Sequence, residues 1–137
     1  MTLHAATCVA IGGRGVLIEG PPGSGKSSLA LALLDRGAAL VGDDGVQLEP
    51  RQGRLWAVPP PNIAGLLEVR NVGLVRFAAA AAPLALIVRL DEGAPRYRDA
   101  ADCLELSGVS IPLVALWPHS PVLALRAEQA LARFGLA

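Results

Sequence analysis

The sequence predicts a single α/β domain in which a mixed sheet carries few helices. The chain has 137 residues, enough for one domain, and 53% of them are apolar, so a core can be buried. Short apolar runs between turn residues outnumber segments with helical spacing. No internal repeat or linker interrupts this pattern, so residues 1–137 are interpreted as one domain.

The composition excludes several function classes. The formal net charge is zero and Lys and Arg form no run, so nucleic acid is not an expected partner. No apolar run reaches the roughly 18 residues of a membrane helix, because Pro83 interrupts the longest candidate. The N-terminus lacks a signal-peptide pattern. Cys8 and Cys103 belong to no metal-ligand pattern, so we expect reduced thiols in a cytoplasmic protein without a membrane partner.

The first elements are predicted to be a hairpin followed by a helix. Residues 7–11 and 16–19 have strand composition and flank a glycine-rich turn. A segment rich in Gly and Pro follows. Apolar residues at helical spacing then predict a helix over residues 26–36, and Gly37 is placed to end it.

Strand signals dominate the middle of the chain. Strands are predicted over residues 38–42, 46–49, 54–58, 66–70 and 73–77. The first of them ends at the acidic pair Asp43 and Asp44. Pro59 to Pro61 force an extended loop, because each ring fixes φ and removes a donor. Asn71 is the turn residue between the last two strands.

The C-terminal part is predicted to hold strands and a final helix. Residues 84–90 form an apolar run typical of a buried strand, and two further strands are predicted over residues 104–106 and 111–116. The final helix is expected to take Ser120 as its N-cap and Pro121 as its first residue, and to end at Gly135.

One segment carries a specific chemical motif. Gly20-Pro21-Pro22-Gly23-Ser24-Gly25-Lys26-Ser27 matches the P-loop pattern G-x-x-x-x-G-K-[ST] between a predicted strand and helix. Glycines let the backbone N–H groups point at phosphate oxygens, Lys26 can reach the β- and γ-phosphates, and the Ser27 hydroxyl can ligate Mg²⁺. The residues predicted to bind nucleotide are Gly20, Pro21, Pro22, Gly23, Ser24, Gly25, Lys26, Ser27 and Ser28.

A P-loop does not by itself distinguish kinases, hydrolases and switches, so a second acidic element is needed. Asp91, after the apolar strand, is the candidate that the simplest doubly wound order favours. The pair Asp43 and Asp44, after the strand that follows the P-loop helix, offers two functions at once. One carboxylate can help to hold Mg²⁺ and the other can act as a base toward a hydroxyl. We therefore favour the pair.

These segments resemble the catalytic domain of bacterial HPr kinase/phosphorylase. The similarity lies in the P-loop, in Leu40-Val41-Gly42-Asp43-Asp44, and in Leu66-Leu67-Glu68-Val69-Arg70-Asn71-Val72-Gly73-Leu74. It extends to His4 and to Ile111-Pro112-Leu113-Val114, and it covers most of the chain. The resemblance implies a P-loop NTPase-like mixed sheet of the HPr kinase catalytic-domain type.

The resemblance also implies an activity. Members of that family use ATP and Mg²⁺ to phosphorylate a serine of HPr, the phosphocarrier of the sugar phosphotransferase system, and also run the reverse phosphorolysis. By resemblance, Asp43 is the catalytic base and Lys26 binds phosphate. Ser27, Asp44 and Glu68 form the Mg²⁺ environment. Arg70 helps to orient the phosphate or the acidic groups, and His4 lies close to the catalytic carboxylate.

The sequence departs from the family at several positions. We expect a short form without the family's N-terminal domain. Gly45 replaces a basic residue, and Asn71 stands where Gly is usual. Family members carry, before the last helix, an arginine that contributes to a neighbouring subunit's site. The corresponding residues 117–121 contain none, although a homo-oligomer is still an expectation. The kinase direction is therefore favoured over phosphorolysis.

Two other functions stay open at this point. The first is a P-loop kinase of a small metabolite, for which Arg96 and Arg98 could supply a lid over the nucleotide. The second is a nucleotide-binding regulator without catalysis, whose ligand state a partner reads. The acidic pair beside the P-loop argues against the regulator, because a binder needs no base.

Overall fold

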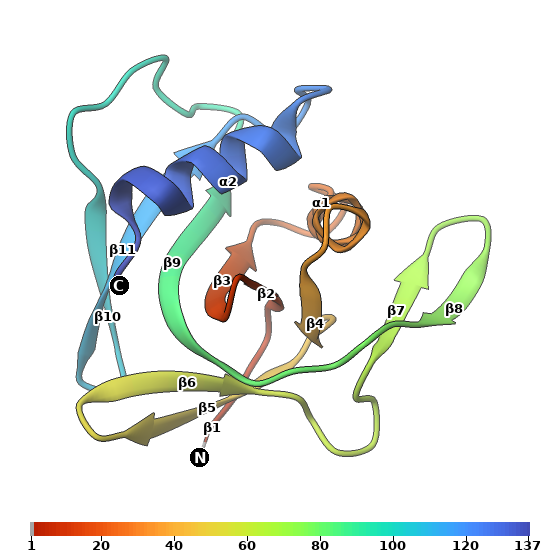
Figure 1. Ribbon diagram of the computed structural model, residues 1–137. Helices are drawn as coiled ribbons and strands as arrows, with labels where there is room; N and C mark the ends of the chain where they lie inside the picture. Colours follow the sequence, from red (N-terminus) through yellow and green to blue (C-terminus); the bar gives the residue numbers. More distant parts are fainter. Residues whose placement is uncertain (1) are drawn as a thin grey trace.

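A curled mixed sheet forms most of the protein, and both helices pack against one of its faces (Figure 1). The computed structural model describes residues 2–137, and within them nine strands belong to this sheet. They are β1 (Thr2–His4), β2 (Thr7–Ile11), β3 (Arg14–Glu19), β4 (Ala39–Gly42), β5 (Val46–Arg51), β6 (Arg54–Val58), β9 (Ala82–Leu90), β10 (Asp102–Leu106) and β11 (Val109–Leu116). The helices are α1 (Lys26–Asp35) and α2 (Leu123–Phe134). The predicted mixed α/β fold with few helices is confirmed.

Three parallel strands form the centre of the sheet. β9 pairs in parallel with β3 on one side and with β11 on the other. The inner residues of β9 are a nearly continuous apolar run with both faces covered, as expected for a central parallel strand. Because these three strands run in the same direction, their carboxyl ends meet at one edge, from which the loop after β3 leaves the sheet.

The core lies on both faces of these strands. On one face, alternate residues of β3 and β9, such as Ile18 and Val88, pack against α1 and α2. On the other face, Leu17 and Ile87 pack against residues of β5, β6 and β11, because the curled sheet turns back over its own centre (Figure 1). Packing on both faces therefore holds the carboxyl ends of these strands in place, and the P-loop begins at that edge.

Helix α1 begins and ends at glycines, as its sequence predicts. Gly25 precedes it with a φ of 101°, and Gly37 follows it with a φ of 105°, both in the left-handed region that glycine enters without strain. Gly37 donates to the Leu34 carbonyl and Ala38 to the Leu33 carbonyl, which closes the last turn as a Schellman motif. The prediction is confirmed, with the last helical residue at Asp35.

The predicted start of α2 is wrong. The helix begins at Leu123 with Val122 as its N-cap, and Ser120 and Pro121 precede it. The Ser120 hydroxyl does accept a hydrogen bond, but from the Val122 N–H at 3.1 Å, so it closes a turn ahead of the helix. The helix ends at Phe134 before Gly135, as predicted.

The remaining strands follow the prediction with one omission. β7 (Leu66–Val69) and β8 (Gly73–Arg76) form a separate two-stranded hairpin, with Asn71 in its turn at a φ of 70°. β1, a three-residue edge strand, was not predicted; among the described residues it pairs with β5. Its Leu3 is 68% exposed, so β1 carries no apolar alternation that could have revealed it.

The two cysteines are free and differ in environment. Cys8 lies fully buried in β2, and burial raises the pKa of its thiol well above the ordinary value. Cys103 lies exposed in β10. Over the part of the chain that the structure describes, no helix has the length and apolarity needed to cross a membrane.

We predict that one thiol reacts in the native protein and two react after unfolding. Cys103 is accessible, whereas Cys8 is shielded and protonated, so it should react only through global opening. Titration with a chromogenic disulfide reagent, with and without denaturant, measures this. Rapid modification of both thiols in native buffer would contradict the burial of Cys8, and the Cys103→Ser variant identifies the reactive residue.

Candidate functional site

The loop between β3 and α1 forms a curled cradle at the edge of the sheet. Its path depends on glycine, because a Cβ on Gly20 would lie 2.5 Å from the Ser24 hydroxyl oxygen. Gly23 and Gly25 both have positive φ. The Ser24 N–H donates to the Pro21 carbonyl at 3.1 Å, which tightens the curl. The loop thus takes the strand-to-helix position that the motif requires.

Positive charge gathers within this cradle. The Lys26 ammonium donates to the Gly20 carbonyl at 2.8 Å, so it reaches back across the loop. Lys26 also opens α1, whose first turn holds no acidic residue. The unpaired N–H groups and the positive end of the helix dipole therefore reinforce the lysine, and the cradle suits an anion such as a phosphate chain.

Asp43, directly after β4, joins the P-loop to two other segments. Its Oδ1 accepts from the Ser27 hydroxyl at 2.7 Å and from the Thr7 hydroxyl at 3.3 Å. Its Oδ2 accepts from the backbone N–H of Glu68 at 3.1 Å. The structure therefore brings together the P-loop serine and the favoured carboxylate, which lie 16 residues apart in the sequence.

Thr7 is a further residue of this centre, and it was not predicted from the sequence. It is fully buried, and its hydroxyl contacts both the Asp43 carboxylate and the Asp44 backbone N–H, the latter at 3.4 Å. A threonine at the start of a strand carries no signal of this kind, because only the pairing of β2 with β4 places it beside Asp43.

A tight turn sets the direction of the acidic pair. A Cβ on Gly42 would collide with the carbonyl oxygen of Gly45, so only glycine fits at that position. Asp44 then takes a φ of 58°, in the left-handed region, and its side chain is exposed. Asp43 is therefore held inward by hydrogen bonds while Asp44 faces solvent.

Other predicted site residues lie around this centre without joining it. Within the described residues, His4 pairs with Glu19 at 3.4 Å and makes no hydrogen bond to Asp43. Glu68 reaches Asp43 through its backbone only, and its side chain is exposed. Arg70 lies exposed in the turn between β7 and β8. Asp91 is exposed and accepts from the Gly93 N–H at 2.8 Å, a surface turn.

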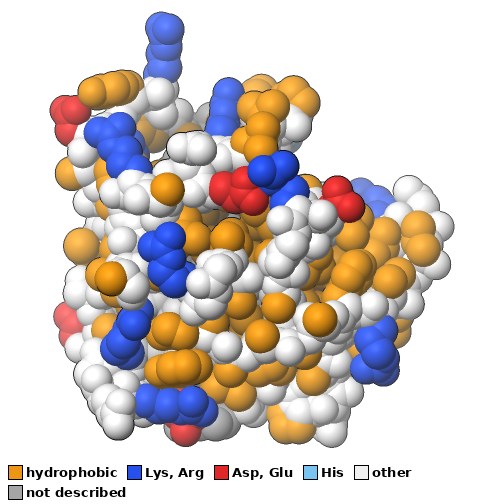
Figure 2. All heavy atoms as spheres, viewed as in Figure 1, with side chains coloured by type: hydrophobic (Ala, Val, Ile, Leu, Met, Phe, Trp, Pro, Cys, Tyr) orange, Lys and Arg blue, Asp and Glu red, His pale blue; other side chains and the backbone are white. Residues whose placement is uncertain are grey.

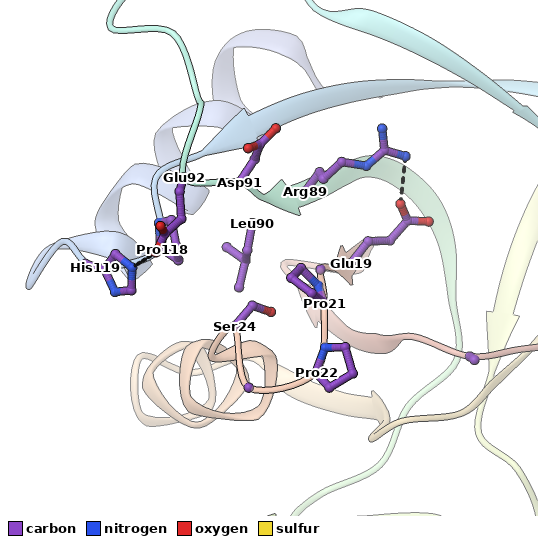
Figure 3. Close-up of a pocket in the computed structure, with 13 residues that line it drawn as sticks. Glu19, Pro21, Pro22, Ser24, Arg89, Leu90, Asp91, Glu92, Pro118 and His119 are labelled. Atoms are coloured by element: carbon purple, nitrogen blue, oxygen red, sulfur yellow. Dashed lines mark hydrogen bonds and ion pairs between the residues drawn. The ribbon is translucent and has the colours of Figure 1, made fainter.

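A pocket of about 820 Å³ lies beside the P-loop (Figure 3), and Asp43 is not among its lining residues. Its walls are the loop itself, the end of β9 and the segment before α2. Arg89 bonds Glu19 at 3.0 Å across one wall, and His119 contacts Glu92 at the other. No sequence signal singles out Glu19, Arg89 or Glu92, because isolated charges at strand ends usually lie on a solvated face.

The residues of the site fit a nucleotide together with a metal ion. The Ser24 hydroxyl is buried beside this pocket with no hydrogen-bond partner among residues 2–137, an orphaned donor that a ligand oxygen would satisfy. No three His, Cys, Asp or Glu side chains of that range converge on a metal position. Mg²⁺ does not need such a set, since it commonly takes one or two carboxylates together with substrate phosphates. The Ser27–Asp43 contact therefore fits Mg²⁺ with a nucleotide.

Comparisons with known proteins agree with this geometry. The family model described as HPr Serine kinase C-terminal domain matches residues 1–81. The HPr kinase/phosphorylase of Streptococcus thermophilus is 37% identical over 122 residues, which cover 79% of this chain and 40% of that protein. The HPr kinase/phosphorylase of Clostridium tetani is 44% identical over 63 residues, 46% of this chain and 21% of that protein. The chain thus spans well under half the length of these curated relatives.

A solved structure extends the similarity to the fold of almost the whole chain. The Hpr(Ser) kinase/phosphatase from Coxiella burnetii superposes with a TM-score of 0.85 at 26% sequence identity. The match covers 96% of this chain and 89% of that one, so it includes α2 and the C-terminal strands beyond the family-model match.

We predict that Gly42→Ala destabilises the protein and Gly45→Ala does not. The first methyl group meets a backbone oxygen that cannot move without shifting Asp43, which should cost at least about 2 kcal/mol of unfolding free energy. The second lies 3.8 Å from the Leu3 side chain, an ordinary contact. Urea unfolding of both variants measures the difference, and equal stabilities would show that the turn is not constrained in this way.

We also predict that Lys26→Ala weakens the binding of nucleoside triphosphate by at least about tenfold, because a charge-assisted contact to phosphate is lost. Titration with a fluorescent ATP analogue measures the affinity. Arg54→Ala, which removes a half-buried cation outside the site, is the matched control. Full affinity in the Lys26 variant would remove the assignment of this loop as a phosphate cradle.

Proposed function

Because the chain belongs to the HPr serine kinase C-terminal domain family, we propose that it is an ATP-dependent protein kinase that phosphorylates a serine of an HPr-like phosphocarrier protein. The observation that carries the proposal is the 2.7 Å hydrogen bond between Ser27 and Asp43. It places a carboxylate beside the phosphate cradle, as transfer to a hydroxyl requires and as nucleotide storage does not.

Different residues of the chain would bind the phosphate chain of ATP and the Mg²⁺ ion. Backbone N–H groups of the P-loop and the Lys26 ammonium would hold the phosphate chain, and the Ser24 hydroxyl would gain a partner in it. Ser27 would ligate Mg²⁺, with Asp44 and Glu68 as nearby acidic groups. Mg²⁺ held there would neutralise charge on the transferring phosphoryl oxygens.

Asp43 is suited to move the proton of the acceptor. Three hydrogen bonds from Ser27, Thr7 and Glu68 fix the orientation of its carboxylate, so it need not reorganise during transfer. In the kinase direction it accepts the proton of the seryl hydroxyl, and in phosphorolysis it would return that proton. Arg70, in the adjacent hairpin turn, would orient the phosphate as the acceptor approaches, and His4 would act on the carboxylates only through Glu19.

The metabolite-kinase alternative has lost its main support. It required Arg96 and Arg98 to close over the nucleotide, yet both line a different pocket from the one beside the P-loop. Arg98 is also bound to Asp102 at 3.0 Å. The non-catalytic regulator is distinguished from the kinase by turnover, since a binder should hold ATP without label transfer.

The cellular setting follows the same proposal. Both cysteines are free, and one of them is exposed, which suits the reducing cytoplasm. The partner is the phosphocarrier rather than nucleic acid or a membrane. A homo-oligomer remains a prediction from the family resemblance.

We predict that Asp43→Asn abolishes phosphate transfer and keeps nucleotide binding. The amide cannot accept a proton, whereas the P-loop stays intact, so transfer should fall by at least about a hundredfold. The measurement is transfer of label from ATP to purified HPr with Mg²⁺. The matched control is Asp44→Asn, whose effect on transfer should be relieved in part by more Mg²⁺.

The opposite pattern would exchange the roles of the two carboxylates. In that case Asp44→Asn would lose transfer at every Mg²⁺ concentration, and Asp43→Asn would transfer label with an altered Mg²⁺ dependence. Absence of label on HPr from the wild-type chain, with ATP bound, would overturn the proposed acceptor and favour the regulator.

A further inference from the structure

A second pocket lies where α2 meets the end of β11 and the loop after β9. It measures about 460 Å³, and its lining residues come from these three segments. None of its lining residues is shared with the pocket beside the P-loop. It therefore needs an explanation separate from phosphate transfer.

This pocket is strongly cationic. Arg96 and Arg98 reach it from the loop, Arg126 and Arg133 reach it from α2, and no Asp or Glu is among its lining residues. Arg98 is bound to Asp102, which lies outside the lining. Arg96, Arg126 and Arg133 form no ion pair or side-chain hydrogen bond within residues 2–137. Arg133 lies against the Phe134 ring, so Arg96 and Arg126 are the two guanidinium groups most available to a ligand.

The positive charge of this pocket comes from the placement of its arginines and not from an excess of basic residues in the chain. The chain has a formal net charge of zero. Several other arginines are paired with a carboxylate: Arg36 with Glu128, Arg51 with Glu49 and Arg89 with Glu19. Unpaired like charges on neighbouring segments repel one another, and a bound anion would relieve that repulsion.

The same pocket exposes apolar surface. Tyr97 is 72% exposed, and Val122 and Leu125 are each 43% exposed along its edge. Val114 and Ala130 form a buried floor, and the Arg133 guanidinium lies 5.0 Å from the ring centre of Phe134. Figure 2 shows hydrophobic and Lys or Arg side chains next to each other over the region of α2 and the loop after β9. A ligand that matches this lining carries an anionic group at one end and an apolar body at the other.

We propose that this pocket binds a small amphipathic organic anion, a carboxylate or phosphate monoester with an apolar body. The planar guanidinium groups of Arg96 and Arg126 match the oxygens of either head group, and the apolar body lies against Leu125 and the buried floor. A small molecule is favoured over a protein segment because the volume falls in the range of small-ligand pockets, about 300–1,000 Å³.

The test is direct binding, so it does not depend on kinase activity. The probe is 8-anilinonaphthalene-1-sulfonate, with octanoate and octyl phosphate as competitors that distinguish the two head groups. We expect saturable 1:1 binding that either competitor displaces. The double variant Arg96→Gln/Arg126→Gln should bind about tenfold or more weakly, and Leu125→Ser should also bind more weakly.

Two controls keep the result interpretable. Arg76→Gln removes an exposed arginine of β8, far from the pocket lining, and should leave probe affinity unchanged. Slow native-state reactivity of Cys8 checks that each variant is folded. Unchanged probe affinity in the double variant would overturn the proposal. So would displacement by an acidic peptide but by neither small anion, which would indicate a protein partner.

Discussion

The hydrogen bonds of the Asp43 carboxylate are the constraint on which the site depends. Through Asp43 they connect three separate parts of the chain: Ser27 at the start of α1, Thr7 in β2 and Glu68 in the β7–β8 hairpin. Each donor satisfies an oxygen that would otherwise lose solvation as the carboxylate becomes half-buried. The same contacts that make burial of the charge tolerable also fix its direction, so stability and chemical positioning come from one arrangement.

The parts of this arrangement that are local in sequence could be predicted, and those that need tertiary contact could not. The P-loop, α1 and its closing glycines depend on spacing within a few residues, and the prediction of each was close to the structure. The start of α2 was wrong because Ser120 can close a turn or cap a helix with the same hydroxyl, and only packing decides between them. Thr7 and Glu19 were missed because their partners lie across the sheet.

The parallel trio β3, β9 and β11 explains why such distant residues meet. Residues after β3, β9 and β11 all emerge at one edge, which places the P-loop, the Arg89–Glu92 segment and His119 around one pocket. β4 lies on the other side of β3 from β9, beyond β2. The two antiparallel pairings of β2 make β4 run in the same direction as the trio, so Asp43 emerges at the same edge, beside α1. A slip of β4 by one residue would turn Asp43 away from Ser27, because side chains alternate between the two faces of a strand.

The P-loop therefore separates two differently built sides. Toward β9 and β11 lies the large pocket with paired charges, and toward β4 lies the Asp43 carboxylate with the hairpin beyond it. Phosphoryl transfer requires the leaving and attacking oxygens to stand roughly in line on opposite sides of the phosphorus atom. A nucleotide whose body occupies the first side and whose terminal phosphate reaches Lys26 and Ser27 would present that phosphate to the second side. For the proposed kinase, the acceptor hydroxyl would then approach from the side of Asp43, whose Oδ2 accepts from the Glu68 N–H of the β7–β8 hairpin.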